Sequence, residues 1–189
     1  MPYVSLLRQL GCQSVKFNLR AQHKHGEMHA QRHLDTGKVV ITKVNLHREA
    51  SAHDMAHEVG HVIDYLIQTA EGSGGSRDSN FLGHTESLRK IADYTCAHHE
   101  GSSPDAVRRL KNRPASKDRH RAVHKLERYY DGYVYQPEEL FARLVAVSFT
   151  EPDKAKAIAP AAYAWLQEAL VEHPRIRTAL ADVGLWPVS

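Results

Sequence analysis

Apolar and polar residues alternate in two short stretches of the N-terminal third of the chain, a pattern typical of half-buried strands. The first is SVKFNLR (14–20), and the second is the β-branched segment KVVITKVN (38–45), which follows the turn residues Asp35-Thr36-Gly37. The polar segment between them, AQHKHGEMHAQRH (21–33), predicts a loop with a short extended piece. We therefore expect a small β-sheet in this part of the chain.

From about Ser51 the pattern changes to a helical period. In segment 51–68 one side of the helical wheel carries only apolar side chains, namely Met55, Val59, Val62, Ile63 and Leu66. A polar loop, EGSGGSRDSN (71–80), follows, and two or three helices are expected across 82–130. Pro137 opens another helix, and the tail from Asp153 predicts an amphipathic helix around Trp165 and a short last helix.

Strands followed by helices predict an α+β fold, with a small N-terminal sheet packed on the helix at 51–68 and a mainly helical C-terminal part. We expect one domain over residues 1–189, since this length can bury a substantial core without division. Hydrophobic residues make up 42% and charged residues 25%, as in ordinary globular proteins.

Localisation is expected to be cytoplasmic, with no membrane as a partner. No apolar run approaches the length of a membrane span, and the first residues, MPYVSLLRQLGCQ, lack the basic and apolar regions of a signal peptide. Cys12 and Cys96 are too few for a disulfide framework, which agrees with a reducing compartment. The sequence leaves the oligomeric state open.

The net charge of +3 is too small to indicate a nucleic-acid partner by itself, but basic residues concentrate in one stretch. Nine Lys or Arg lie between Val107 and Tyr130, against the acids Asp118 and Glu127. One interpretation is a solvated helical surface. The other is a docking patch at 107–128 for an acidic partner or a nucleic acid, although no stacking aromatic residues are interleaved with the charges.

The centre of the helix at 51–68 reads His57-Glu58-Val59-Gly60-His61, which is the HExxH zinc pattern. With 14 histidines in 189 residues, chance produces this pattern about 0.06 times in such a chain. The helical period puts His57 and His61 one turn apart on the side opposite the apolar residues. There they can bind one Zn²⁺, and Glu58, which borders the same face, is placed to act as a base. The competing interpretation is the solvated polar face of an amphipathic helix.

A zinc site needs a third protein ligand. The later candidates are His84, His98, His99, His120, His124, Glu138 and Glu139. Glu139 is favoured because apolar residues flank its stripe of the helix that Pro137 opens, so its carboxylate is directed inward. The competing interpretation is that acids in a first helical turn serve only the helix dipole.

The motifs HEVGHVIDY (57–65) and PEELFAR (137–143) resemble those of zincin metallopeptidases of the gluzincin type. The chain looks most like the metallopeptidase-like domain of large polyvalent proteins of phages and conjugative elements, and is more distantly similar to the catalytic domain of anthrax lethal factor. The resemblance covers about residues 38–149. It implies that Glu139, before an apolar-Phe-Ala triplet, is the third ligand. It also implies a zincin-like fold.

One position departs from the lethal-factor pattern. That pattern often has a carboxylate four residues after the third ligand, where this chain has Arg143, as the polyvalent-protein pattern does. An arginine cannot accept a hydrogen bond from an imidazole N–H. Asp64 or a backbone carbonyl is therefore expected to accept that bond.

These observations predict a zinc endopeptidase acting on a protein or peptide substrate. His57, His61 and Glu139 hold the metal, and Glu58 takes a proton from the attacking water. Tyr135 or Tyr133 is the candidate donor to the oxyanion. Two alternatives stay open: a zinc-stabilised nucleic-acid or partner-binding module of a mobile genetic element, and a peptidase that acts on DNA-bound proteins.

Overall fold

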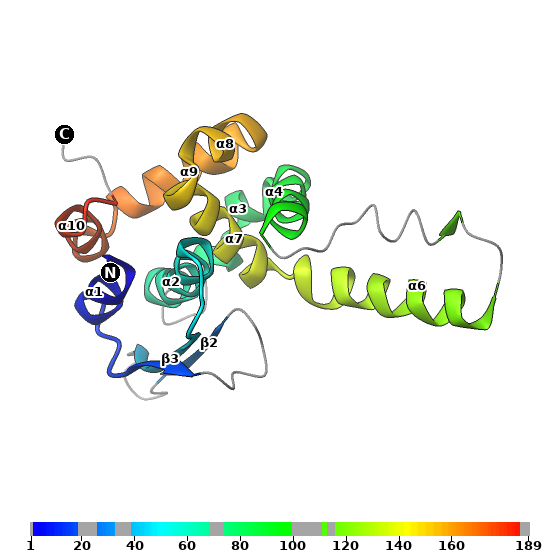
Figure 1. The fold of residues 1–189 in the computed structure, drawn as a ribbon. Helices are drawn as coiled ribbons and strands as arrows, with labels where there is room; N and C mark the ends of the chain where they lie inside the picture. The colour runs from blue at the N-terminus through cyan, green and yellow to red at the C-terminus, as the bar shows by residue number, and fades with distance from the viewer. Residues whose placement is uncertain are drawn as a thin grey trace.

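The computed structural model describes residues 2–18, 26–32, 39–68, 74–99, 111–112 and 116–185. The fold is α+β and mostly helical, with a small three-stranded mixed sheet (Figure 1). The sheet lies on one side of α2 (Ala52–Ile67), and α7 (Pro137–Thr150) packs closely against α2. The expected α+β class is therefore confirmed, whereas the single domain over 1–189 stays a prediction.

The central strand of the sheet is β3 (Val39–His47). It pairs in parallel with β1 (Val15–Asn18) and antiparallel with β2 (Gly26–Arg32). The sequence predicts the segments of β1 and β3 as strands and expects a loop with a short extended piece in the segment that contains β2. That extended piece corresponds to β2, which has seven residues. Its alternation of apolar and polar residues is weak because an edge strand can carry polar side chains.

Helix α1 (Pro2–Gln9) was missed, since the pattern of the N-terminal third predicts strands and turns. Its eight residues bury Tyr3, Leu6 and Leu7, at 5%, 0% and 0% exposure. A helix this short has little stability of its own, so packing against α2 and α10 (Pro174–Asp182) stabilises it. Such packing leaves little trace in a short sequence window.

Helix α2 begins with a complete capping box. The Ser51 side chain accepts a hydrogen bond from the Asp54 N–H, and the Asp54 carboxylate accepts one from the Ser51 N–H. The apolar side expected from the wheel is buried, with Val59, Val62 and Ile63 at 0% exposure. The opposite side, which includes His57 and Glu58, is also buried, because α7 covers it.

Helix α7 runs antiparallel to α2 through the centre of the molecule. Glu139, in the first turn of α7, contacts His61, whereas Thr150, at the other end of α7, contacts His53 near the start of α2. Every residue of α7 from Glu139 to Ser148 is buried. A helix buried all round presents groups from several of its sides to its neighbours, which lets α7 contribute to more than one site.

Besides α1, α2 and α7, the described residues form eight further helical elements. They are the 3₁₀ turn η1 (Gly75–Arg77), α3 (Ser79–Gly83), α4 (Thr85–His98), α6 (Lys117–Tyr129), the π-helical turn η2 (Tyr130–Val134), α8 (Pro152–Ile158), α9 (Pro160–Val171) and α10. Figure 1 shows α6 projecting away from the other helices, and η2 connects it to α7. The predicted helix around Trp165 corresponds to α9, and α10 is the predicted short last helix.

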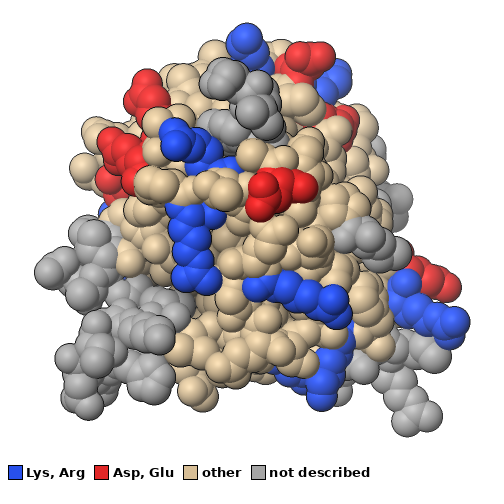
Figure 2. Space-filling view, turned by 90° about the vertical axis from the view of Figure 1, so that its left-hand side faces the viewer, with Lys and Arg blue, Asp and Glu red and all other residues tan. Residues whose placement is uncertain are grey.

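The face of the molecule that carries α1 and α10 has charges of both signs. Figure 2 shows Lys and Arg side chains on it, interspersed with Asp and Glu and separated by uncharged areas. Within the described residues, no helix is long and apolar enough to cross a membrane.

Candidate metal centre

Helices α2 and α7 bring together His57, His61 and Glu139, the three residues that the sequence predicts as metal ligands. The Nε2 atoms of the two histidines are 3.2 Å apart. Glu139 Oε2 lies 3.3 Å from His57 Nε2, and Glu139 Oε1 lies 3.4 Å from His61 Nε2. The imidazole rings are nearly perpendicular, at 86°, so that both Nε2 atoms converge on one point.

These separations match the requirements of a tetrahedral zinc site. Bonds of about 2.0–2.1 Å to nitrogen and oxygen, at tetrahedral angles, separate neighbouring ligand atoms by about 3.3–3.4 Å. The 3.2 Å between the two Nε2 atoms is close to that spacing, and the Glu139 carboxylate spans both rings, with Oε2 3.3 Å from His57 and Oε1 3.4 Å from His61. Two imidazoles and a carboxylate are also a ligand set that zinc takes in catalytic sites. The residues present therefore fit the ion.

Gly60 allows this convergence, and its role was not foreseen from the sequence. A Cβ atom at Gly60 would lie 2.7 Å from the Ala142 Cα and 2.9 Å from the Ala142 carbonyl oxygen. Contacts this short do not occur, so any larger residue would push α7 away from α2. The small residue between the two histidines thus sets the spacing that lets Glu139 reach both of them. The sequence shows a glycine inside the helix at 51–68, but it does not show that this glycine faces Ala142 on another helix. That contact depends on how the two helices pack.

The protonation equilibria of the three side chains are strongly coupled. Burial lowers the pKa of His57, which favours the neutral ring that a metal ligand needs. Burial also opposes charge on His61, but its hydrogen bond to Glu139 and the nearby carboxylates together raise its pKa. Burial would raise the pKa of Glu139, yet its hydrogen bonds to the two histidines, and their charges, hold that pKa well below the ordinary range. The carboxylate is therefore ionised at neutral pH.

Glu58 is buried beside this group, at 3% exposure, and its charge contributes to raising the pKa of His61. This position agrees with the border of the ligand face expected from the wheel. Asp64, expected as one acceptor for a zinc histidine, accepts hydrogen bonds from the Ser76 N–H at 2.6 Å and from its hydroxyl at 2.8 Å. Asp64 therefore anchors η1, and it acts on His61 as a nearby negative charge.

The structure separates the two tyrosines proposed as oxyanion donors. Tyr133 lies in η2 near Glu139, and its partial burial together with the Glu139 charge raises its pKa. The Tyr135 hydroxyl instead donates to the Asp93 carboxylate on α4, at 2.7 Å. Tyr135 is thus hydrogen-bonded to α4, and which of the two tyrosines could donate to an oxyanion stays a prediction.

The other candidates for the third ligand lie elsewhere. Glu138 precedes Glu139 and belongs to neither group of metal-ligand side chains among the described residues, and His120 and His124 are exposed on α6. His99 belongs to a second group of metal-ligand type, with His53 and Glu151, that the sequence did not predict. The available signal was His53 itself, which lies one turn before His57 on the same side of α2. The part of the basic stretch from 107 to 110 and from 113 to 115 lies outside the described residues.

No family model, curated protein or solved structure matches the chain. What the site can do is therefore argued from its own residues.

Proposed function

We propose that the chain is a zinc-dependent endopeptidase with a zincin-like fold of the gluzincin type. The observation that carries this proposal is the convergence of His57 Nε2, His61 Nε2 and the Glu139 carboxylate, whose two oxygens lie 3.3 and 3.4 Å from one ring each. It is supported by the helical HExxH motif and by a third ligand from a separate antiparallel helix. These three residues would hold the metal. Bound zinc would act as a Lewis acid toward a water and toward the substrate carbonyl.

The protein's own side chains supply the remaining chemistry. Glu58 takes a proton from the attacking water and passes it to the leaving amine, the role of a general base that then becomes a general acid. Glu58 is buried beside the histidines, where little water competes with its carboxylate for the proton. Tyr133 is half exposed, at 46%, so its hydroxyl can meet a substrate and donate to the developing oxyanion.

The ligand group is open enough for a substrate to reach it. The side chains of His57, His61 and Glu139 are 10%, 16% and 11% exposed. A site enclosed for stability alone would have all coordination positions filled by protein, whereas three protein ligands leave a position free. A protein or peptide substrate is thus the expected partner.

The proposal is tested by pairing metal content with cleavage. The wild-type protein and Glu58→Gln are each loaded with zinc and incubated with a proteome-derived peptide library, and new termini are identified by mass spectrometry. Wild type should generate new termini, and Glu58→Gln should retain one zinc at the ligand group and generate none. Glu86→Gln is the matched control, because Glu86 lies on α4 with 90% of its side chain exposed and forms an ion pair with Lys90. Equal cleavage by wild type and Glu58→Gln would contradict the proposal.

A second candidate function is a partner-binding module of a mobile genetic element, in which zinc serves only stability. The observation in its favour is α6, which projects from the body and exposes Arg121, Lys125 and Arg128. DNA binding that weakens steeply with salt, together with no peptide cleavage, would support it. Cleavage combined with salt-dependent DNA binding would instead indicate a peptidase acting on DNA-bound proteins.

A further inference from the structure

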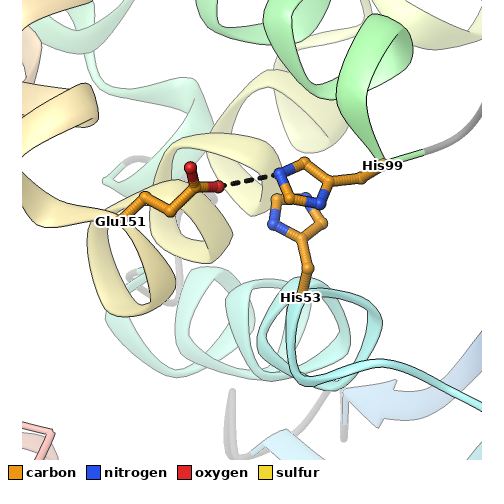
Figure 3. A group of neighbouring side chains, drawn as sticks. All are labelled: His53, His99 and Glu151. Carbon is orange, nitrogen blue, oxygen red and sulfur yellow. Dashed lines mark hydrogen bonds and ion pairs between the residues drawn. The ribbon is translucent and has the colours of Figure 1, made fainter.

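A second cluster of metal-ligand side chains lies one helical turn from the first. It consists of His53 on α2, His99 at the end of α4 and Glu151 at the end of α7, and one ligand atom from each lies within 4.8 Å of the others. Figure 3 shows the two imidazoles and the carboxylate approaching one another from these three elements. We propose that His53, His99 and Glu151 form a second site for a divalent transition metal of the zinc class, separate from the candidate catalytic group.

The most direct support is His53, which is buried at 5% exposure. Among the described residues, its Nε2 atom has no hydrogen-bond partner. Its Nδ1 atom lies 3.4 Å from the Thr150 hydroxyl, which is long for a hydrogen bond. Buried polar atoms are normally satisfied, and one that is not calls for an explanation such as an ion. A coordinate bond to a metal would satisfy this imidazole.

Glu151 is already held in the orientation that a ligand needs. Its Oε1 atom lies 2.8 Å from His99 Nε2, and its Oε2 atom accepts a hydrogen bond of 2.6 Å from the Tyr94 hydroxyl. Carboxylates that bind metals are commonly positioned by such an outer hydrogen bond. Tyr94 thus leaves Oε1 directed at His99, which is the side on which an ion would bind.

Helix ends of both signs meet at this cluster. His99 and Glu151 are the C-terminal caps of α4 and α7, and each helix carries partial negative charge at that end. The positive ends of α2 and α8 lie here too, since His53 is in the first turn of α2 and Glu151 is also the N-terminal cap of α8. The helix ends therefore do not select the sign of a bound ion, and the donor types of the three side chains carry that argument.

Binding requires a small movement, which the surroundings permit. The His53 and His99 rings are stacked, with centroids 3.8 Å apart and planes at 2°. Lone pairs lie in the ring planes, so one ring must tilt before both can point at one ion. His99 is the ring that can tilt, because 25% of its side chain is exposed and it caps a helix end. The ion would then join the start of α2 to the ends of α4 and α7.

The test counts metal equivalents in the full chain and in variants of each group. Metal-free protein is titrated with Co²⁺, whose visible absorption reports its ligands, and Zn²⁺ is then added in competition. Wild type should bind two equivalents, His99→Ala should bind one, and Glu139→Ala should keep the equivalent that His99→Ala loses. His98→Ala is the matched control, since His98 is the exposed neighbour whose Nδ1 contacts the Tyr94 carbonyl. It should keep both equivalents.

A second variant guards against misfolding. Glu151→Gln preserves the shape of the side chain and can still accept from Tyr94, so it should fold while losing the second equivalent. A wild-type protein that binds one equivalent, lost in Glu139→Ala and kept in His99→Ala, would overturn the second site and leave the proposed catalytic metal intact. One equivalent that is lost in His99→Ala and kept in Glu139→Ala would uphold the second site and contradict the proposed function. Equal losses in His98→Ala and His99→Ala would also overturn it, and a simple ion pair of His99 with Glu151 would then explain the cluster.

Discussion

The two clusters on α2 and α7 contain the same donor types, two histidines and one glutamate, yet they differ in order. In the first, the three ligand-atom contacts are 3.2–3.4 Å and the rings are perpendicular at 86°. In the second, His99 Nε2 lies 2.8 Å from Glu151 Oε1, but the His53 and His99 rings stack at 2°, so their nitrogens do not point at one ion. The first group is thus already arranged for a tetrahedral ion, whereas the second must adjust to bind one.

The difference follows from where each group lies along the helices. His57, His61 and Glu139 lie beside the close contact of Gly60 with Ala142, where the two helix backbones cannot shift independently. The second group lies at one helix start and two helix ends, where fewer backbone hydrogen bonds restrain the chain. Ligand identity therefore defines which metals a group can take, and the packing of the backbone defines how much it must rearrange.

The largest expected effect is the loss of the first metal in Glu139→Ala. Zn²⁺ affinity at this group, measured by chelator competition, should fall about 100-fold or more, since removal of a ligand exceeds the 10–100-fold cost of losing a supporting residue. Glu138→Ala is the control. Glu138 contributes a helix-dipole interaction of about 0.3–1 kcal/mol, so its loss should leave Zn²⁺ affinity nearly unchanged. Similar losses of Zn²⁺ affinity in Glu139→Ala and Glu138→Ala would show that Glu139 is not the specific third ligand.

Tyr133→Phe should lower kcat by about 100–1000-fold and leave the metal in place, since one oxyanion donor is worth about that much. Steady-state cleavage of a peptide from the library screen, together with zinc content, measures both effects. Tyr135→Phe should retain kcat, because the Tyr135 hydroxyl donates to Asp93. If Tyr135→Phe reduced kcat as strongly as Tyr133→Phe, the assignment of the donor to η2 would be wrong.

Gly60→Ala should destabilise the fold by about 1–3 kcal/mol, the usual cost of inserting a methyl group into a packed interface. It should also weaken zinc binding, because the added Cβ would lie 2.7 Å from the Ala142 Cα and separate Glu139 from the histidines. Urea unfolding and a Zn²⁺ titration measure the two effects. Gly83→Ala is the control, since a Cβ there meets nothing within 4 Å. Unchanged zinc affinity in Gly60→Ala would show that the close contact of Gly60 with Ala142 does not set the geometry of the three ligands.

The smallest expected effect is that of Ser51→Ala, which removes the N-cap of α2. The free energy of unfolding should fall by about 1 kcal/mol, with faster amide hydrogen exchange in the first turn of α2. Exchange of the amides around Val59 and His61 should change little, because α7 covers them. Equally faster hydrogen exchange along the whole of α2 would show that its start and its centre unfold together. That result would contradict the inference that the backbone is less restrained at the second group than at the first.

Much of the first site was predictable because it depends on short-range periodicity. A helical spacing of four puts His57 and His61 on one side of α2 whatever surrounds the helix, and the structure agrees. The inward direction of Glu139 was likewise predictable from its apolar neighbours. The helix α1 was not predictable, and β2 was expected only as a short extended piece, since each is short and is stabilised by contacts with other elements.

The sequence by itself determined the chemistry that the chain offers: an HExxH helix, an inward glutamate after Pro137 and the α+β order of elements. Only the tertiary structure decided which of those groups meet. It brought Tyr133 near Glu139 and the Tyr135 hydroxyl to Asp93, placed Gly60 in the close contact of α2 with α7, and brought His53, His99 and Glu151 together from three elements. The physical reason is that periodicity specifies the side of a helix on which a residue lies, whereas the partner of that side depends on contacts between segments about 50 to 100 residues apart.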